Sequence, residues 1–280
     1  VLTVSLAALM GFGLASCGGG SGKVSDKDIT VISREEGSGT RDAFTELTGV
    51  LQDDVDKTVD TAEISNSTSV VTQSVAGNDA AIGYISLGSL DDTVKAVKVD
   101  GVEATVDNIK SGDYKIQRPF NIVTKGEVKE LPADFIKFIM SKDGQKIIED
   151  EGYISVNDNA EAYKASGLKG SITLAGSTSV SPVMEVLADK YKELNSGVTI
   201  EIQQTGSGAG IQSTTEGVCD IGMASRELKD EETSQGLKSE EIALDGIAVI
   251  VNKDNGVEDL SMDQIMKIFT GEITNWADVK

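Results

Sequence analysis

Histidine is absent from this sequence, and only two of its 280 residues are cysteines. Without histidine, Ser-His-Asp and Cys-His catalysis are excluded, and so are metal sites built on histidine. The two cysteines, Cys17 and Cys219, lie far apart, and no Cys-x-x-Cys motif occurs. Paired thiols at metal-binding spacing are therefore missing as well. We expect no metal, no cofactor and no enzymatic activity.

Positive charge is scarce too. The chain has 25 lysines and arginines against 46 aspartates and glutamates, which gives a formal charge of −21. A nucleic-acid interface needs a basic stripe, so nucleic acid is not an expected partner. The net charge does not exclude a small anion, because local groups and not the total charge govern a binding site.

Long apolar runs are absent after the first residues, so no second segment is predicted to span a bilayer. The opening run, residues 1–17, resembles the apolar part of a secretory signal and ends in Leu14–Cys17, which matches a bacterial lipobox. It predicts lipidation at Cys17, followed by a flexible glycine-rich tether over residues 18–26. A short buried helix is the alternative interpretation. The basic region that precedes the apolar run of a secretory signal is absent here, so whether the N-terminus is complete stays open.

The rest of the chain alternates between predicted strands and helices, which indicates an α/β fold. A helix is predicted over residues 131–152, and another beginning near Ser181, which would cap it ahead of Pro182. Ser261 and Gln264 form a capping-box pattern that opens a further helix. The predicted strands cover residues 28–33, 80–88, 118–126, 171–176, 198–204, 218–225 and 246–254.

Three loops rich in small residues each follow a predicted strand and precede a predicted helix. Their sequences are "REEGSGT" from Arg34, "GSTSVSP" from Gly176 and "TGSGAG" from Thr205. Helix N-termini offer unpaired N–H groups, glycines allow close approach, and hydroxyls add donors. Arg34 adds a planar fork that matches two oxygens of an oxyanion. The loops therefore favour an oxyanion site, while plain helix capping and a surface ion pair of Arg34 are the alternatives.

Six motifs together resemble a known family. They are "SREEGSGTRDAF", "GSTSVSPVMEVLADKY", "GSGAGI", "CDIGMASRELKDEE", "ALDGIAVIVN" and "IFTGEITNWADV". They are similar to those of the phosphate-binding proteins of bacterial phosphate ABC transporters, in the Gram-positive lipoprotein form. The resemblance covers nearly all of the chain after the tether.

The order of these motifs differs from that of the family. There the "GSTSVSP" half comes first and "SREEGSGT" follows "NWADV", whereas here the order is reversed. A circular permutation and a fragment of a tandem duplication are the two explanations. Permutation predicts that Lys280 and the segment near Lys27 are neighbours in one lobe, because rejoining them restores the family order.

The resemblance implies a two-lobed fold of the type II periplasmic-binding-protein class, with the ligand between the lobes. Lobe A is expected to be continuous, over residues 92–249. Lobe B is expected to be split, over residues 27–91 and 250–280.

The resemblance also implies the site residues. Thr178, Ser179 and Ser207 would donate hydrogen bonds from lobe A. Asp220 would accept the proton of phosphate and repel sulfate, which carries none. The residues implied in lobe B are Arg34, Ser38, Gly39 and Thr40.

The expected function is that of a monomeric receptor, anchored by lipid on Cys17 to the extracytoplasmic face of the cell membrane. It would bind inorganic phosphate and deliver it to the permease subunits of an ABC transporter. A receptor for sulfate or molybdate and a surface lipoprotein without a transport role are the alternatives.

Overall fold

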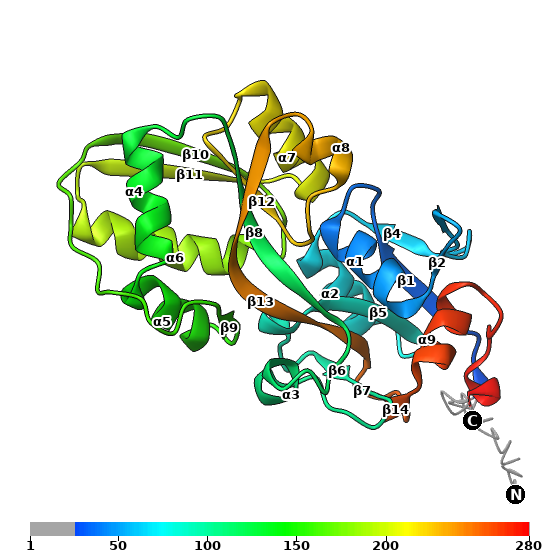
Figure 1. Ribbon diagram of the computed structural model, residues 1–280. Coiled ribbons are helices and arrows are strands. Elements are labelled where there is room, and N and C mark those ends of the chain that lie inside the picture. The colour runs from blue at the N-terminus through cyan, green and yellow to red at the C-terminus, as the bar shows by residue number, and fades with distance from the viewer. Residues whose placement is uncertain (1–25, 280) are drawn as a thin grey trace, which may run out of the picture.

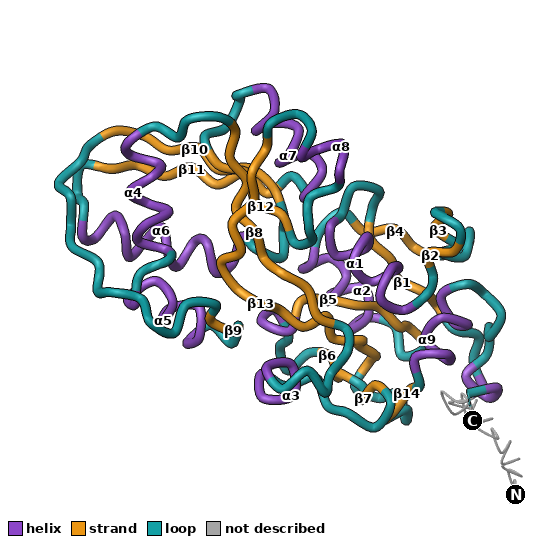
Figure 2. Tube along the Cα trace, in the orientation of Figure 1, coloured by secondary structure: helices purple, strands orange, loops and turns teal. Residues whose placement is uncertain are grey.

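The structure is a computed structural model that describes residues 26–279, in which two lobes are joined by a pair of long crossing strands (Figure 1). The predicted leader with Cys17, nearly all of the predicted tether and Lys280 lie outside these residues. Among the described residues, no helix combines the length and the apolar character needed to cross a membrane. Figure 2 shows helices flanking the strands of each lobe, with β8 and β13 passing between the lobes.

One ten-stranded sheet runs through both lobes in the order β11-β10-β12-β8-β13-β5-β1-β4, with β6 and β9 paired to β13. Strand β13 (Leu237–Asn252) belongs to both lobes: its first part pairs with β8 (Gln117–Lys125) and its second part with β5 (Ala81–Ser86). The change of partner falls between Gly246, opposite Gln117, and Ile247, opposite Ser86. This point is the geometric junction of the two lobes.

Lobe A is built on three parallel strands, β10 (Gly170–Gly176), β11 (Val198–Gln204) and β12 (Ile221–Ala224). Its core is an apolar cluster that includes Phe120, Leu174 and Leu187. The remaining elements of this lobe are β9 (Ile154–Ser155), α4 (Glu130–Ile139), α5 (Lys142–Asp150), α6 (Ser181–Leu194), α7 (Ser207–Glu216) and α8 (Asp230–Thr233).

Lobe B is built on β1 (Thr30–Arg34), which lies between β5 and β4 (Glu63–Ser65), all three parallel. Phe44 stacks on Tyr84 with ring centroids 3.9 Å apart in the centre of its core. The remaining elements are β2 (Leu51–Gln52), β3 (Val55–Asp56), β6 (Val94–Ala96), β7 (Lys98–Val99), β14 (Asp259–Leu260), α1 (Gly39–Thr48), α2 (Thr68–Gly77), α3 (Val106–Lys110) and α9 (Met262–Phe269).

Four elements differ from the predictions. The strand predicted over residues 218–225 covers only Ile221–Ala224. The single helix predicted over residues 131–152 is two helices, because Ser141 caps the start of α5 and accepts a hydrogen bond from Gly144 N. Strand β13 begins nine residues before the predicted strand 246–254, since its polar first half pairs with β8. Ser181 does not cap α6: its hydroxyl donates to the carbonyl of Ser177 at 2.9 Å.

The boundary between the lobes also differs from the predicted position at residue 92. Val94, Val97 and Ile109 pack into the apolar clusters of lobe B, and so do Ile247 and Val249. We therefore place residues 92–117, and β13 from Ile247 onward, with lobe B.

The two ends of the described chain meet in lobe B, as the prediction of permutation requires. Trp276 N donates to Lys27 O at 3.0 Å, and Ile29 N donates to Thr274 O at 2.8 Å. Figure 1 shows the same juxtaposition, with the blue start of the chain beside its red end. Lys280 itself is outside the described residues.

Candidate functional site

Arg34 is the cation of the site, and it is buried where β1 ends. Its Nε and Nη2 donate to the two carboxylate oxygens of Glu35, each at 2.8 Å. Nε also donates to Ser65 O, and Nη2 reaches across to Thr178 Oγ1 at 3.1 Å. The guanidinium is thus held in one orientation by groups of lobe B while it touches lobe A.

The loop after Arg34 turns into helix α1 through Gly37, whose φ of 81° suits glycine. Ser38 is the N-cap residue of α1, and its side chain accepts from Arg41 N. Gly39 and Thr40 form the first turn, so their backbone N–H groups belong to the positive end of the helix.

The two loops of lobe A lie at the carboxyl ends of their strands. Thr178 and Ser179 follow β10, and Ser207 opens α7 directly after the loop that follows β11. In open α/β sheets ligands bind at this edge. All three side chains are buried.

Hydroxyl groups of the two lobes bond directly to each other. Thr40 and Ser179 are joined at 2.9 Å, and Thr68 lies 3.2 Å from Thr178 and 3.3 Å from Ser179. These contacts, with the one from Arg34, bring the lobes together in a closed arrangement. We call Thr40, Thr68, Thr178 and Ser179 the hydroxyl cluster.

Three buried serines of lobe A, Ser177, Ser225 and Ser207, are linked in a row by hydrogen bonds. Ser177 Oγ donates to Ser225 Oγ at 2.9 Å, and Ser225 N donates to Ser207 Oγ at 3.2 Å. Gly39 of lobe B packs closely against two of these serines. A Cβ at this position would lie 2.5 Å from Ser207 Oγ and 2.9 Å from Ser225 Oγ. A side chain at residue 39 would hold the lobes apart.

Seven of the eight predicted residues therefore come together: Arg34, Ser38, Gly39, Thr40, Thr178, Ser179 and Ser207. Sequence reasoning missed Glu35, Thr68, Ser177 and Ser225. The signal for Thr68 was present, because "SNSTS" (residues 65–69) also follows a strand and precedes a helix.

Asp220, the eighth predicted residue, lies away from the other seven. It stands before β12, whereas Ser225 follows it, and the five residue steps between the two positions correspond to about 16 Å of extended strand. Its carboxylate pairs with Lys129 at 2.9 Å and accepts from Thr173 N at 3.1 Å. Burial raises the pKa of Asp220, but the hydrogen bonds of Lys129 and Thr173 and the charge of Lys129 outweigh it and hold the pKa below its ordinary value. Asp220 is therefore an ionised residue at the wrong end of the strand to meet a ligand beside Arg34.

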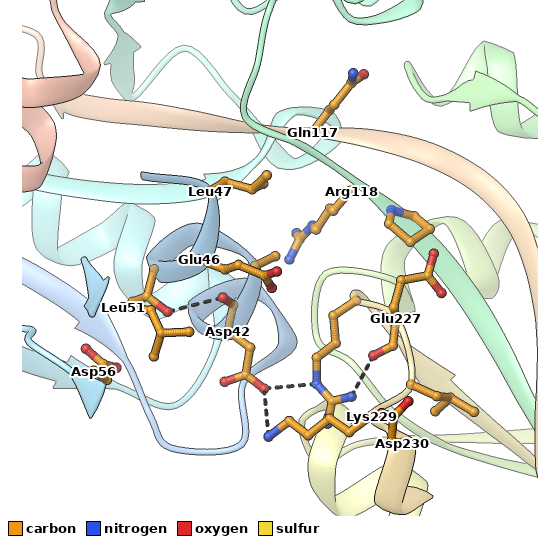
Figure 3. Close-up of a pocket in the computed structure, with 15 residues that line it drawn as sticks. Asp42, Glu46, Leu47, Leu51, Asp56, Gln117, Arg118, Glu227, Lys229 and Asp230 are labelled. Atoms are coloured by element: carbon orange, nitrogen blue, oxygen red, sulfur yellow. Dashed lines mark hydrogen bonds and ion pairs between the residues drawn. The ribbon is translucent and has the colours of Figure 1, made fainter. Parts of the chain in front are cut away.

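A cleft of about 530 Å³ opens between helix α1 of lobe B and residues 226–230 of lobe A. Figure 3 shows Asp42 of α1 on one wall and Glu227, Lys229 and Asp230 of lobe A on the other. Arg226 bridges the walls: its Nε donates to Asp42 Oδ2 at 2.9 Å, and two further nitrogens donate to the carboxylate of Glu232. Burial lowers the pKa of Arg226, but the hydrogen bond and charge of Glu232, together with Asp42, raise it overall, so the residue is a permanent cation.

The hydroxyl cluster and the groups around it offer many hydrogen-bond donors, which is the chemistry that an anion requires. A buried guanidinium, several hydroxyls and the N-termini of α1, α6 and α7 converge between the lobes. Each of these groups can donate a hydrogen bond, and the helix ends add positive potential. Two lobes that close on a ligand around crossing strands define the class of solute-binding proteins.

Comparison with known proteins gives the family. The chain belongs to the PBP superfamily, whose domain model matches residues 21–143 and 161–280. It is 52% identical over 283 residues to the phosphate-binding protein PstS 2 of Streptococcus agalactiae, across 99% of this chain and 96% of that protein. It is 48% identical to the phosphate-binding protein PstS 2 of Streptococcus pneumoniae, across 100% of this chain and 98% of that protein.

A solved structure agrees with this assignment. The crystal structure of a phosphate-binding protein of a phosphate ABC transporter from Streptococcus pneumoniae superposes with a TM-score of 0.74 at 49% identity. The match covers 91% of this chain and all of that one, so the two-lobed α/β fold of the periplasmic-binding-protein class is shared.

The unusual order of the motifs is shared with the streptococcal relatives, because each aligns across essentially the whole chain. The alignment with the phosphate-binding protein PstS of Bacillus subtilis, by contrast, covers only part of each chain. It gives 38% identity over 127 residues, which is 45% of this chain and 42% of that protein. The reversed order is therefore not peculiar to this chain.

Proposed function

We propose that the chain is a receptor that encloses inorganic phosphate between its lobes and delivers it to an ABC permease. The observation that carries the proposal is the contact of Arg34 Nη2 with Thr178 Oγ1 across the lobe interface. It places the cation of lobe B on the hydroxyl loop of lobe A, where a bound oxyanion would touch both. The names of the full-length relatives point to the same ligand.

Binding would replace contacts between hydroxyls with contacts to the anion. Thr40, Thr68, Thr178 and Ser179 now bond to one another at 2.9–3.3 Å. Oxygens of a tetrahedral anion would accept from these hydroxyls and from the backbone at the start of α1. The ligand would thus join the lobes more strongly than the hydroxyls do alone, since hydrogen bonds to an ionised acceptor are the stronger ones.

Selectivity for phosphate over sulfate needs a new physical basis, because Asp220 is remote from the cluster. Serine and threonine hydroxyls accept as well as donate, so they can accept a hydrogen bond from the O–H group that phosphate carries near neutral pH. The Glu35 carboxylate, bound to Arg34, is a second acceptor at the edge of the cluster. Sulfate has no proton to donate, so it would meet the Glu35 carboxylate without a hydrogen bond, whereas the hydroxyls can turn and donate to sulfate as they do to phosphate. A sulfate or molybdate receptor remains the alternative function, and the names of the relatives disfavour it.

The cellular setting is part of the proposal. Lipid on Cys17 would anchor a monomer to the extracytoplasmic face of the membrane, with lobe B nearest the bilayer. Its partners would be phosphate and the permease subunits, and it would perform no covalent chemistry. The relatives are named as binding proteins, which supports this view.

Calorimetric titration of the chain with phosphate, arsenate and sulfate tests the proposed ligand. We expect phosphate and arsenate to bind and sulfate to bind far more weakly. Arg34→Gln should weaken phosphate binding by roughly 10- to 100-fold, because a hydrogen bond to a charged group contributes about 1.5–3 kcal/mol. The control, Lys129→Gln, removes a cation of lobe A that pairs with Asp220 away from the cluster, and it should leave the affinity within twofold.

Two results would contradict the proposal. Tighter binding of sulfate than of phosphate would favour the alternative receptor. Equal losses in both variants would mean that general electrostatics, and not Arg34, binds the anion.

A further inference from the structure

A buried ion pair lies at the junction of the lobes, outside the hydroxyl cluster. Arg118 of β8 and Asp245 of β13 face each other in the antiparallel ladder. Nε and Nη2 of Arg118 donate to Asp245 Oδ2 at 3.2 and 3.1 Å, and both side chains are 1% exposed. One register step further on, β13 leaves β8 and continues along β5.

Stability alone does not account for this pair. Two charges are expensive to desolvate, and well-packed apolar residues in place of a buried ion pair are often neutral or stabilising. Burial lowers the pKa of Arg118 against the opposing charge of Asp245, and it raises the pKa of Asp245 to about 6 against the charge of Arg118. Burial raises the pKa of Tyr114 and of Tyr153, and the charge of Asp245 adds to the rise in both.

The outer bonds of the pair reach into both lobes. Ser86 of β5, in lobe B, donates its hydroxyl to Asp245 Oδ1 at 2.9 Å. On the other side, Arg118 Nη1 donates to the carbonyl of Ser225 in lobe A at 3.3 Å. The ion pair is thus the middle of a chain of hydrogen bonds that runs from lobe B through the crossing strands to lobe A.

Ser225 connects this chain to the binding loops. Its hydroxyl accepts from Ser177, and its N–H donates to Ser207. The Cα of Gly39, in the anion loop of lobe B, packs directly on Ser207 and Ser225. The position of Ser225 therefore sets how closely Gly39 and Thr40 can approach lobe A.

We propose that Arg118, oriented by Asp245 and Ser86, is a positioning residue that fixes Ser225 and thereby the closed geometry of the anion site. Arg118 does not touch the ligand: its guanidinium is occupied by Asp245 and the Ser225 carbonyl. This inference rests on the proposed binding of phosphate between the lobes.

A double variant, Arg118→Met with Asp245→Leu, separates positioning from folding. Both charges are removed together, so neither is left buried without a partner, and we expect thermal stability equal to that of the wild type or higher. Phosphate affinity should nevertheless fall about tenfold, because substitutions along a coupled network change coupling by factors of this order without contacting the ligand. The control is Gln145→Met, which removes another buried side chain that bonds backbone carbonyls, here those of Ile139 and Ile242. It should lower thermal stability and leave phosphate affinity unchanged.

Arg118→Lys is the second variant, in case the double variant does not fold. Lysine keeps the charge opposite Asp245 but has no second nitrogen to bond Ser225, so affinity should fall here too while the ion pair survives. Wild-type affinity in a folded double variant, or in Arg118→Lys, would overturn the positioning role. If the wild type itself shows no phosphate binding, the proposed function fails instead, and the two failures are distinguished.

Discussion

The ion pair between Arg226 and Asp42 is expected to stabilise the closed form of the two lobes relative to the open form. The variant Asp42→Asn tests this expectation. The Nε–Oδ2 distance of 2.9 Å joins lobe A to helix α1 of lobe B. Arg226 is 8% exposed and Asp42 is 29% exposed, so the pair lies between a buried and a surface ion pair. Arg226 keeps both hydrogen bonds to Glu232 in the variant, so no buried charge is left unpaired.

The size of the effect follows from this partial exposure. A hydrogen bond between charged groups contributes about 1.5–3 kcal/mol when buried, and an exposed ion pair about 0–1 kcal/mol. For the partly exposed pair we take about 1 kcal/mol, which corresponds to about a fivefold change in the equilibrium between closed and open forms. Only the closed form contains the contact, so the loss should appear as about fivefold faster release of phosphate. High salt should reduce the difference.

Calorimetry for the affinity and a chase of labelled phosphate for the release rate would measure the effect. The matched control is Asp56→Asn, because Asp56 pairs with Arg41 at 2.7 Å within lobe B and is 27% exposed. It should change thermal stability slightly and leave the release rate unchanged. If Asp42→Asn releases phosphate at the wild-type rate, or if both variants release it equally fast, the ion pair of Arg226 and Asp42 does not stabilise the closed form.

Three further predictions follow from the described side chains. Burial raises the pKa of Asp245 from its ordinary value of 3.8 to about 6, so its stabilising contribution is complete below pH 3.8 and is lost as the pH rises through 6. The ligand-free protein should therefore gain about 1 kcal/mol of unfolding free energy from pH 7 to pH 5 in calorimetry, a gain that Asp245→Asn should abolish. Asp220→Asn should leave the ratio of phosphate to sulfate affinity unchanged in titrations. A changed ratio would mean that Asp220 contacts the ligand. Thr178→Val, which keeps the shape of the side chain and removes its hydroxyl, should weaken phosphate binding by roughly 5- to 10-fold at nearly unchanged thermal stability, since about 1 kcal/mol is typical of one hydrogen bond; wild-type affinity would show that this hydroxyl does not contact the ligand.

Local patterns in the sequence were sufficient to predict the three small-residue loops that meet between the lobes. Glycines and hydroxyls between a strand and a helix indicate a helix N-terminus that faces the carboxyl edge of a sheet, and this pattern identified the loops around Arg34, Thr178 and Ser207. It works because the ends of a strand and of the helix after it depend mainly on nearby residues. The capping box of Ser261 and Gln264 was found for the same reason, and α9 begins there.

Asp220 is the one predicted site residue that lies away from the hydroxyl cluster among the described residues. The motif containing it resembles the family pattern, and the resemblance alone implied that Asp220 contacts the ligand. Strand β12 runs parallel to β10, so its carboxyl end at Ser225 lies at the edge of the sheet where the hydroxyl cluster is, and Asp220 stays at its amino end beside Thr173. The predicted strand over residues 218–225, combined with the rule that ligands bind at the carboxyl ends of strands, already disfavoured Asp220.

The sequence by itself determined the α/β class, the three small-residue loops between strands and helices, and the adjacency of the two chain ends, because local propensity and motif order carry that information. Only the tertiary structure decided that β13 serves both lobes, that Arg118 and Asp245 meet at the junction, and that Arg226 bridges to Asp42. These features join residues 127 and 184 positions apart. The physical reason is that an ion pair or a shared strand depends on how the lobes pack in space, and the chain's local periodicity contains no record of that packing.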